Sequence, residues 1–460
     1  MNKITLCALF ALVTLGASVL AVAEPIPAPV QVASGYRNDG SGVWPDATPA
    51  ILDGAKPKTL WTTPLPGGGD SAPLLVGDMV VITTEPDQVL AFDAATGKER
   101  WKATCDVFST YGDTGAALKD AFFAAHAINT DYNVFKADPI VVAAKEKMKT
   151  AKCEVYIALP VERPSYATSS PCSDGTNIIV KFRTGIVACY DLKGQETWKQ
   201  RMAGAITYSS PIFVAGKGIV PTARGHVALD PATGKVLWEN AKISEGAWGT
   251  VQTIRLGDRL VGISGGGQIF DPANGKVLAE TAVFGQHATL ACWHDIVIVP
   301  EGHFYNRDKN PQVRAFRLTP SDDGGISAKE IWHMPGNFNN CQPTICLDGY
   351  FVIETGSLKG MKNGNTIQEF KALDGTIGPE PFLRSLGGAP HVANAGLSVA
   401  GNTCIGLGAD GTILIANMVN GSLKETSKAK LPVDIYRAAP AFAGKRMYVH
   451  GHTQLLCLGE

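Results

Sequence analysis

The sequence has little charge, few aromatic residues and no second long apolar run. Charged residues make up 18% and aromatic residues 8% of the 460 residues, and 41 Lys and Arg balance 42 Asp and Glu. A formal net charge of −1 provides no global basic field, so we expect no nucleic-acid partner. The 50 Gly and 28 Pro are too few for collagen or a low-complexity chain. A hydrophobic content of 45% instead predicts a large folded core.

Residues 1–23 have the pattern of a secretory signal peptide. Lys3 supplies the charged start, residues 6–22 are apolar, and Ala-Val-Ala precedes Glu24 as a cleavage site. A retained membrane anchor is the alternative, since about 20 apolar residues can span a bilayer. Cys7 lies inside the apolar stretch rather than after it, which disfavours a lipid anchor. We therefore expect a periplasmic or extracellular protein with no membrane anchor after cleavage.

One phrase recurs along the chain: an alternating apolar run, Asp, a turn with Gly, and a charged run ending in Trp. It occupies residues 89–101, 186–198, 226–238 and, with Ala in place of Trp, 267–279. Each copy predicts a β-hairpin, because Asp opens a type I turn and Gly takes the position with positive φ. The final residues of the last three copies are 40 and 41 residues apart, which is the length of a four-stranded propeller blade.

A second hairpin precedes each copy, and eight such starts can be counted between Ser71 and Ala438. The last repeat lacks its fourth strand, while the residues around Trp61 form a fourth strand with no first three. Pairing these two ends would close the ring and remove exposed sheet edges. The sequence thus predicts an all-β, eight-bladed β-propeller of four-stranded antiparallel blades over residues 58–460. Residues 24–57 lack strand periodicity and should form an irregular segment along it, with Trp44 packed into a groove.

The tryptophans that recur at blade period are expected to pack between neighbouring sheets rather than bind a ligand. They are Trp61, Trp101, Trp198, Trp238 and Trp332.

At Asp93, Asp191, Asp230 and Asp271 the phrase resembles the pyrroloquinoline quinone (PQQ)-like repeat family of eight-bladed propellers. That resemblance implies the fold but not one activity, because the family includes quinoprotein dehydrogenases, the outer-membrane assembly lipoprotein and exported propellers of no assigned activity. Quinoprotein alcohol dehydrogenases typically carry two adjacent cysteines against the quinone, and no two cysteines are neighbours here. The lipoprotein's lipid-bearing cysteine is also missing.

Polar residues are expected to gather on one face of the propeller, where the loops between blades and the turns between second and third strands emerge. Histidine, arginine, carboxylates and aromatic rings around one opening suit a small-molecule or anion site, although solvent exposure alone also predicts polar residues there. The candidate ligand-binding residues are Asp70, Arg183, Tyr208, Arg224, Trp248, His287, Glu301, His303, His391, Arg437 and His450.

Metal binding by the histidines is a further alternative. His287, His303, His391, His450 and His452 could converge, but no tight ligand motif is present, so we expect no metal site.

A helical insertion is expected at about residues 104–165, between blades 1 and 2. Asp113 or Thr114 could cap a helix over 116–128, and Asp138 with Pro139 predicts a second helix to about Lys149. Long structured insertions are often contact elements or lids.

Two cysteines bracket the insertion. Cys105 and Cys153 lie at its ends, and a disulfide between them would fix it; two reduced, buried cysteines are the alternative. The ten cysteines include Cys7 of the leader, so the mature chain has an odd number and at least one free thiol.

These observations favour an exported, monomeric scaffold that binds a protein or small molecule through the loop-rich face and the insertion. The alternative is a PQQ-dependent alcohol or sugar dehydrogenase, with calcium as a second cofactor. No sequence motif supports a hydrolase activity, and no catalytic residue can be named.

Overall fold

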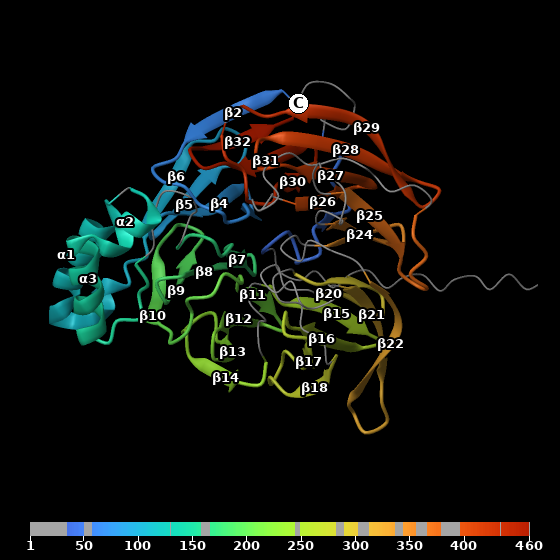
Figure 1. Cartoon of the computed structure of the whole chain (residues 1–460), viewed down its shortest axis with the longest axis horizontal. Coiled ribbons are helices and arrows are strands. Elements are labelled where there is room, and N and C mark those ends of the chain that lie inside the picture. Colours follow the sequence, from blue (N-terminus) through green and yellow to red (C-terminus); the bar gives the residue numbers. More distant parts are fainter. Residues whose placement is uncertain are drawn as a thin grey trace, which may run out of the picture. The chain divides into compact units, whose positions relative to one another are not determined.

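Eight sheets follow one another along the described part of the chain (Figure 1). The structure is a computed structural model. It describes residues 35–49, 58–128, 130–157, 166–243, 249–281, 289–301, 312–335, 344–355, 366–378, 396–432 and 434–459. The expected signal peptide lies outside these residues. The fold is the predicted eight-bladed β-propeller.

Each blade begins with two short antiparallel strands. The first strands are β3 (Leu74–Val76), β7 (Cys172–Ser173), β11 (Ile212–Val214), β15 (Gln252–Leu256), β19 (Ala291–Trp293), β23 (Ile345–Leu347), β26 (Gly396–Ala400) and β30 (Ala441–Ala443). The second strands are β4 (Met79–Thr84), β8 (Asn177–Phe182), β12 (Lys217–Thr222), β16 (Arg259–Ile263), β20 (Ile296–Glu301), β24 (Tyr350–Thr355), β27 (Thr403–Leu407) and β31 (Arg446–His450).

The remaining strands complete the blades. The third strands are β5 (Gln88–Asp93), β9 (Ile186–Asp191), β13 (Gly225–Leu229), β17 (Gln268–Phe270), β21 (Gln312–Pro320), β25 (Thr366–Lys371), β28 (Thr412–Val419) and β32 (Gln454–Leu458). The fourth are β6 (Glu99–Thr104), β10 (Glu196–Arg201), β14 (Val236–Asn240), β18 (Val277–Glu280), β22 (Ile326–Pro335), β29 (Ser422–Lys430) and β2 (Thr59–Pro64).

Burial explains the different sequence patterns of these strands. All six residues of β4 are buried, whereas β6 alternates between exposed and half-buried side chains. A strand covered on both faces takes a continuous apolar run, and an outer strand with one wet face alternates. The sequence of β4 therefore reads as a nearly continuous apolar run, and that of β6 alternates.

The two ends of the propeller close it in one blade, as predicted. Strand β2 pairs antiparallel with β32, and Trp61 lies opposite Cys457 in the register. Among the first strands, β3 contacts both β7 and β30. The first and last blades are thereby joined, and β32 has no free edge.

The recurring tryptophans lock each blade to the next, which confirms their predicted structural role. Each indole Nε1 donates to a carbonyl in the third-to-fourth-strand turn of the following blade. The bonds are Trp61 to Ala94 (3.3 Å), Trp101 to Leu192 (3.1 Å), Trp198 to Pro231 (2.8 Å), Trp238 to Pro272 (3.1 Å) and Trp332 to Ala372 (2.9 Å). A glycine with positive φ in that turn lies against the ring: a Cβ at Gly234 would stand 2.7 Å from Trp198 Cδ2.

A chain of hydroxyl groups also links blades 1 to 5, just before their first strands. The backbone N–H of one blade donates to a Ser or Thr oxygen of the next. The bonds are Ala72 to Ser170 (2.8 Å), Ser170 to Ser210 (2.9 Å), Ser210 to Thr250 (3.1 Å) and Thr250 to Thr289 (3.2 Å). These buried N–H groups are thus satisfied although they belong to no sheet ladder.

Two blades differ from the predicted four strands. In blade 6 the described fourth position is a single bridge between Phe370 and Ile377. Blade 7 gains a fifth strand, because β1 (Val43–Trp44) pairs parallel with β26. Trp44 is buried and meets the Phe442 ring edge-on at 5.0 Å, as expected for a tryptophan packed into a groove.

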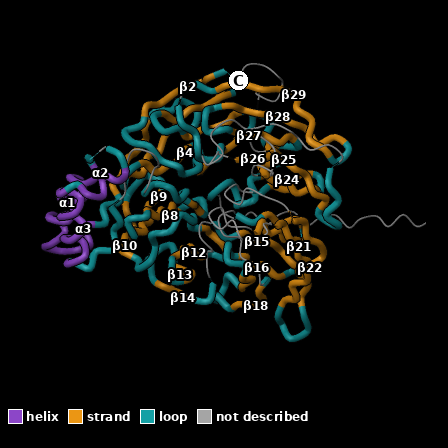
Figure 2. The backbone as a smooth tube through the Cα atoms, viewed as in Figure 1, coloured by secondary structure: helices purple, strands orange, loops and turns teal. Residues whose placement is uncertain are grey.

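The helices form one group between blades 1 and 2 (Figure 2). They are the 3-10 helix η2 (Phe108–Thr114) and the α-helices α1 (Gly115–His126), α2 (Tyr132–Ala137) and α3 (Pro139–Thr150). The two predicted helices are confirmed, and Asp138 accepts a hydrogen bond from Ile140 N as the cap of α3. The six-residue α2, capped by Asp131, was missed because so short a helix shows no 3.6-residue period. Among the described residues, no helix is both long and apolar enough to cross a membrane.

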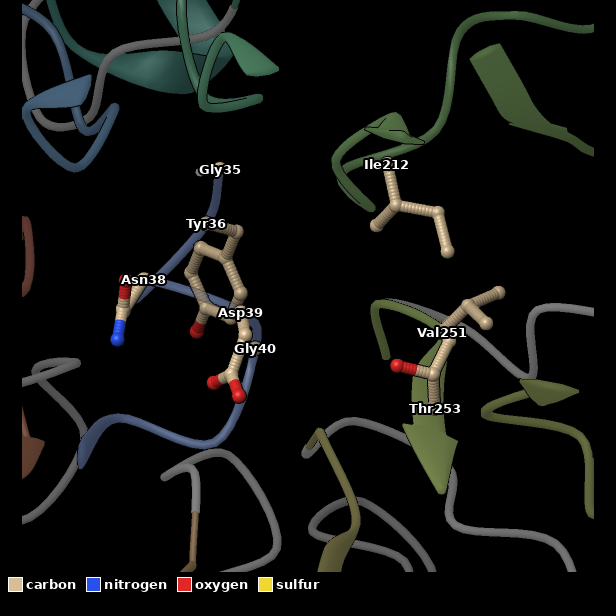
Figure 3. A pocket seen from close by; sticks show the side chains of 8 residues that line it. All are labelled: Gly35, Tyr36, Asn38, Asp39, Gly40, Ile212, Val251 and Thr253. Atoms are coloured by element: carbon tan, nitrogen blue, oxygen red, sulfur yellow. The ribbon is translucent and has the colours of Figure 1, made fainter. Parts of the chain in front are cut away.

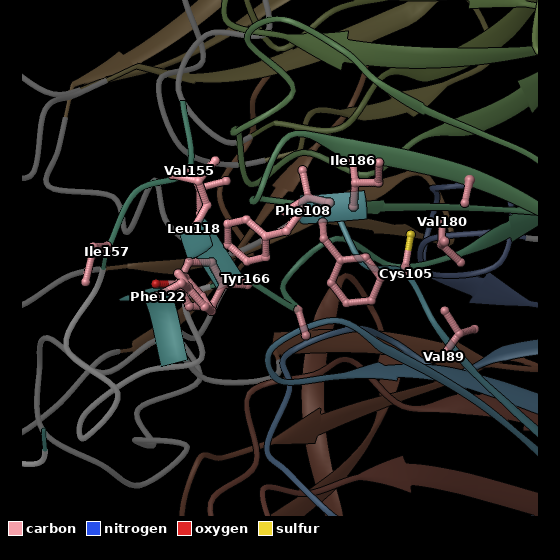
Figure 4. Close-up of a cluster of buried hydrophobic side chains, with 14 of the residues drawn as sticks. Val89, Cys105, Phe108, Leu118, Phe122, Val155, Ile157, Tyr166, Val180 and Ile186 are labelled. Atoms are coloured by element: carbon pink, nitrogen blue, oxygen red, sulfur yellow. The ribbon is translucent and has the colours of Figure 1, made fainter. Parts of the chain in front are cut away.

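The insertion shares a core with blades 1 and 2 (Figure 4). Phe108, Leu118 and Phe122 pack in one cluster with Val89 of blade 1 and Val180 of blade 2. The helices are therefore built into the propeller rather than tethered beside it.

The predicted disulfide between Cys105 and Cys153 is absent, because both cysteines are free, buried thiols. Cys105 lies beside Tyr190 of β9, and Cys153 lies beside Tyr111 of η2. Each thiol has its own partner within the shared core, and burial raises the pKa of Cys105. Packing, and not a covalent link, holds the insertion.

Candidate functional site

The structure describes the side chains of six predicted ligand-binding residues. They are Asp70, Arg183, Tyr208, Arg224, Arg437 and His450. The other five, Trp248, His287, Glu301, His303 and His391, have side chains outside the described part of the chain. Ligand binding by this set therefore stays a prediction.

Arg183 and Tyr208 come together between blades 2 and 3. The guanidinium carbon lies 3.7 Å from the centroid of the Tyr208 ring, and Arg183 Nε donates to Ile206 O at 3.0 Å. This stacking holds a positive charge over the ring of Tyr208, a residue that is 37% exposed. Of the described candidates, this pair has the composition of a recognition site for an anionic or aromatic group.

His450 is fully buried and serves packing. Its Nδ1 lies 2.7 Å from the Ser71 carbonyl oxygen, and a Cβ at Gly69 would stand 2.9 Å from its Cε1. Burial lowers the pKa of His450 to about 4, so the ring is neutral near pH 7. The neighbouring His452 has a lowered pKa as well, because of burial and the charge of Arg437.

Arg224 ties the insertion to blade 3. Its Nη2 lies 3.0 Å from Glu154 Oε1, and Glu154 Oε2 accepts from Gly204 N at 3.1 Å. On the blade 1 side, Glu85 Oε1 accepts from the N–H groups of Tyr166 and Ala167, both at 2.8 Å. The segment that leaves the helices is therefore held at both ends by carboxylates.

Asp87 marks the junction between the insertion and blade 1. Its side chain is buried, and the pKa is raised to about 6, first by burial and then by the like charge of Asp106. Lys119 of α1 opposes this rise and binds Asp106, with Nζ 2.8 Å from Oδ2. Sequence reasoning missed this cluster because its members lie on separate elements.

The N-terminal segment occupies the centre of the propeller. Arg37 Nη2 donates to Leu397 O in blade 7 at 2.7 Å, and Arg37 is 1% exposed. Gly35 lies against Cys172 of blade 2, Gly40 against Gln252 of blade 4, and Trp44 against Phe442 of blade 8. One short segment can reach first strands of such distant blades only by lying among them.

A small cavity remains beside this segment. Figure 3 shows its lining, with residues 35–40 on one side and Ile212 of blade 3 and Val251 before β15 on the other. Its volume is about 10 Å³, which is room for no more than about one water molecule. A fused-ring quinone does not fit there, and within the described residues no group of three His, Cys, Asp or Glu could hold a metal ion.

A larger cavity lies on the insertion, and we call it the insertion groove. Its volume is about 350 Å³. It is lined by Lys145, Met148, Lys149, Cys153, Val155, Tyr156 and Ile157.

The sequence matches the family described as outer membrane protein assembly factor BamB over residues 46–112 and 149–318. The chain belongs to this family. The predicted resemblance to PQQ-like repeat propellers is thereby confirmed. The matched ranges leave out residues 113–148, which contain α1, α2 and most of α3.

Individual relatives are distant. The outer membrane protein assembly factor BamB of Burkholderia pseudomallei is 25% identical over 196 residues, which are 40% of this chain and 48% of that protein. The match thus spans about half the length of this curated relative.

Solved structures share the fold. BamB from Moraxella catarrhalis has a TM-score of 0.54 at 12% identity, with 88% of this chain and 100% of that chain covered. A quinohemoprotein alcohol dehydrogenase from Pseudomonas putida has a TM-score of 0.52 at 12% identity, covering 90% of this chain and 78% of that chain. At these identities the likeness concerns the fold alone.

Proposed function

We propose that this chain is an exported, non-catalytic scaffold that binds other proteins in the periplasm during outer membrane protein assembly. The observation that carries the proposal is the family match over residues 46–112 and 149–318. Membership of the BamB family supports a protein partner.

The exposed apolar surface supports the same reading. Of the twelve large apolar side chains that the described residues expose, five lie on the insertion: Phe123, Val134, Ile140, Val142 and Tyr156. Exposed apolar side chains that adjoin one another mark interaction surfaces, and these five are the candidates on the insertion. The Arg183–Tyr208 pair is a second candidate contact on the loop-rich face.

The dehydrogenase alternative has less support. The fold is shared with a quinohemoprotein alcohol dehydrogenase, but no two cysteines are adjacent in this sequence. We therefore derive no reaction step for this chain.

Site-specific photocrosslinking in cells tests the proposal. A photoreactive amino acid replaces Tyr208 on the loop-rich face or Tyr156 on the insertion. Val236 on the outer strand of blade 3 is the control, since it is also exposed, at 47%, but lies away from both surfaces. We expect discrete adducts with envelope proteins from Tyr208, Tyr156 or both, and none from Val236.

Two results would count against the scaffold. One is the absence of protein adducts at both test positions. The other is a saturable quinone absorbance together with dye reduction when the purified chain receives PQQ, calcium and an alcohol.

A further inference from the structure

The insertion groove has an apolar floor. Met148, Cys153, Val155 and Ile157 line it and are each 8% exposed or less, so its walls are fixed by the core behind them. Tyr156 stands at the rim and is 55% exposed. A volume of about 350 Å³ lies at the lower end of the range for ligand pockets, which fits a few side chains rather than a folded domain.

The rim on the α3 side is positively charged. Lys145 and Lys149 are four residues apart and therefore on one face of the helix. Lys149 is 80% exposed, and its nearest carboxylate, Glu146, is 3.8 Å away and also exposed. Glu154 is engaged by Arg224 and Gly204, so it does not neutralise the rim.

Helix-terminal lysines often only complement the helix dipole. That explanation suits Lys147, which donates to Ala117 O at 3.4 Å. It does not explain why an apolar cavity opens beneath Lys145 and Lys149. Nor does it explain why Val142, three residues before Lys145 and on the same side of α3, is exposed.

We propose that the insertion groove binds an extended segment of a partner protein that presents apolar side chains flanked by carboxylates. The apolar side chains occupy the space over Met148, Val155 and Ile157, and the carboxylates pair with Lys145 and Lys149. This inference rests on the proposed scaffold function and specifies its partner. Of the residues that line the groove, Lys145 and Met148 lie outside the part that matches the family, and the other five lie inside it.

A designed peptide tests the chemistry directly. The probe is a fluorescein-labelled Gly-Asp-Glu-Leu-Phe-Leu-Asp-Glu-Gly, and its binding to the full chain is followed by fluorescence anisotropy. One control peptide replaces the acids with Lys, and a second replaces Leu and Phe with Gly. We expect both controls to bind about ten-fold more weakly than the probe.

Charge reversal locates the site. The Lys145→Glu, Lys149→Glu double variant should weaken probe binding about ten-fold. Lys152→Glu is the matched control, because Lys152 is an exposed lysine just beyond α3 that does not line the groove. It should change binding less than about two-fold. As a readout that needs no variant, the probe should slow alkylation of Cys153, which lies in the groove wall.

Photocrosslinking separates this inference from the scaffold function. Adducts from Tyr156 should disappear in the double variant, while any adduct from Tyr208 persists. If Tyr208 gives adducts and Tyr156 gives none, the groove proposal is overturned and the scaffold stands. Four other results would overturn the groove proposal as well. Two concern the peptides: equal binding of all three, or an equal loss of probe binding in the double variant and in Lys152→Glu. The other two are self-association of the chain through this surface, and binding of anionic vesicles instead of the probe.

Discussion

The packing of each recurring tryptophan on a turn glycine of the next blade leads to a measurable prediction at Gly234. This glycine has φ +72° in the third-to-fourth-strand turn of blade 3, beneath the Trp198 ring of blade 2. In the same blade Gly216 has φ +71°, but a Cβ there would meet nothing within 4 Å. The two positions share the backbone cost of alanine and differ in the tryptophan.

The magnitudes follow from these contacts. Placing alanine in the left-handed region costs about 1–2 kcal/mol at either position. At Gly234 the new Cβ would also stand 2.7 Å from Trp198 Cδ2, so the indole must move. Overpacking costs about 1–3 kcal/mol, and the 2.8 Å bond from Trp198 Nε1 to Pro231 O is worth about 1 kcal/mol. Gly234→Ala should therefore destabilise the protein by about 2–4 kcal/mol more than Gly216→Ala.

Urea denaturation followed by tryptophan fluorescence and far-UV circular dichroism measures this difference. Both variants should keep the native spectrum in the absence of urea, with the lower midpoint for Gly234→Ala. Equal midpoints for the two variants would refute the argument that indole packing on the turn glycine joins the blades.

Three further variants test the buried polar groups. Ser210→Ala removes the oxygen that accepts from Ser170 N at 2.9 Å. Because that N–H is then unsatisfied, the free energy of unfolding measured by urea titration should fall by about 1–3 kcal/mol. An unchanged urea midpoint would contradict the role of the hydroxyl chain. Asp87 has its pKa raised from 3.8 to about 6, so the folded state holds this proton more tightly and stability falls as the pH rises between those values. The free energy of unfolding of Asp87→Asn should therefore exceed that of the wild type by up to about 3 kcal/mol at pH 7.5 and by little at pH 4. A difference that does not depend on pH would argue against a buried carboxyl group. His226 is buried with its pKa lowered from 6.5 to about 4, so stability is lost as the pH falls through that window. His226→Gln should flatten the decline in unfolding midpoint between pH 7 and 4.5, and an identical decline would show that this histidine does not contribute.

Much of the fold could be predicted because it repeats locally. Each hairpin has its own turn residues, with Asp before the turn and Gly at positive φ, as at Asp230 and Gly234. The spacing of these phrases set the number of blades, and the incomplete first and last repeats predicted that Trp61 and Cys457 would meet. The cap of α3 was readable for the same reason, since Asp138 accepts from the nearby Ile140 N, whereas the Thr114 side chain makes no capping hydrogen bond at α1.

The candidate site was less predictable. Arg183 and Tyr208 were named as candidates and do form a pair, but Arg224 contacts the insertion and His450 is buried. Loop position in a propeller can be inferred from strand order, whereas the direction of a side chain depends on contacts with other blades. Glu154 was missed because no local pattern marks a carboxylate that bridges two distant elements.

The sequence by itself determined the eight blades, their closure and the tryptophan locks, because each depends on hairpins whose information lies within about 40 residues. Tertiary structure alone decided that the aperiodic segment around Arg37 lies among the first strands of the blades, that Cys105 and Cys153 stay unbonded, and that a groove with a charged rim opens beside α3. Those features depend on contacts between residues far apart in the chain. Burial and packing select such contacts, and they leave no period in the sequence.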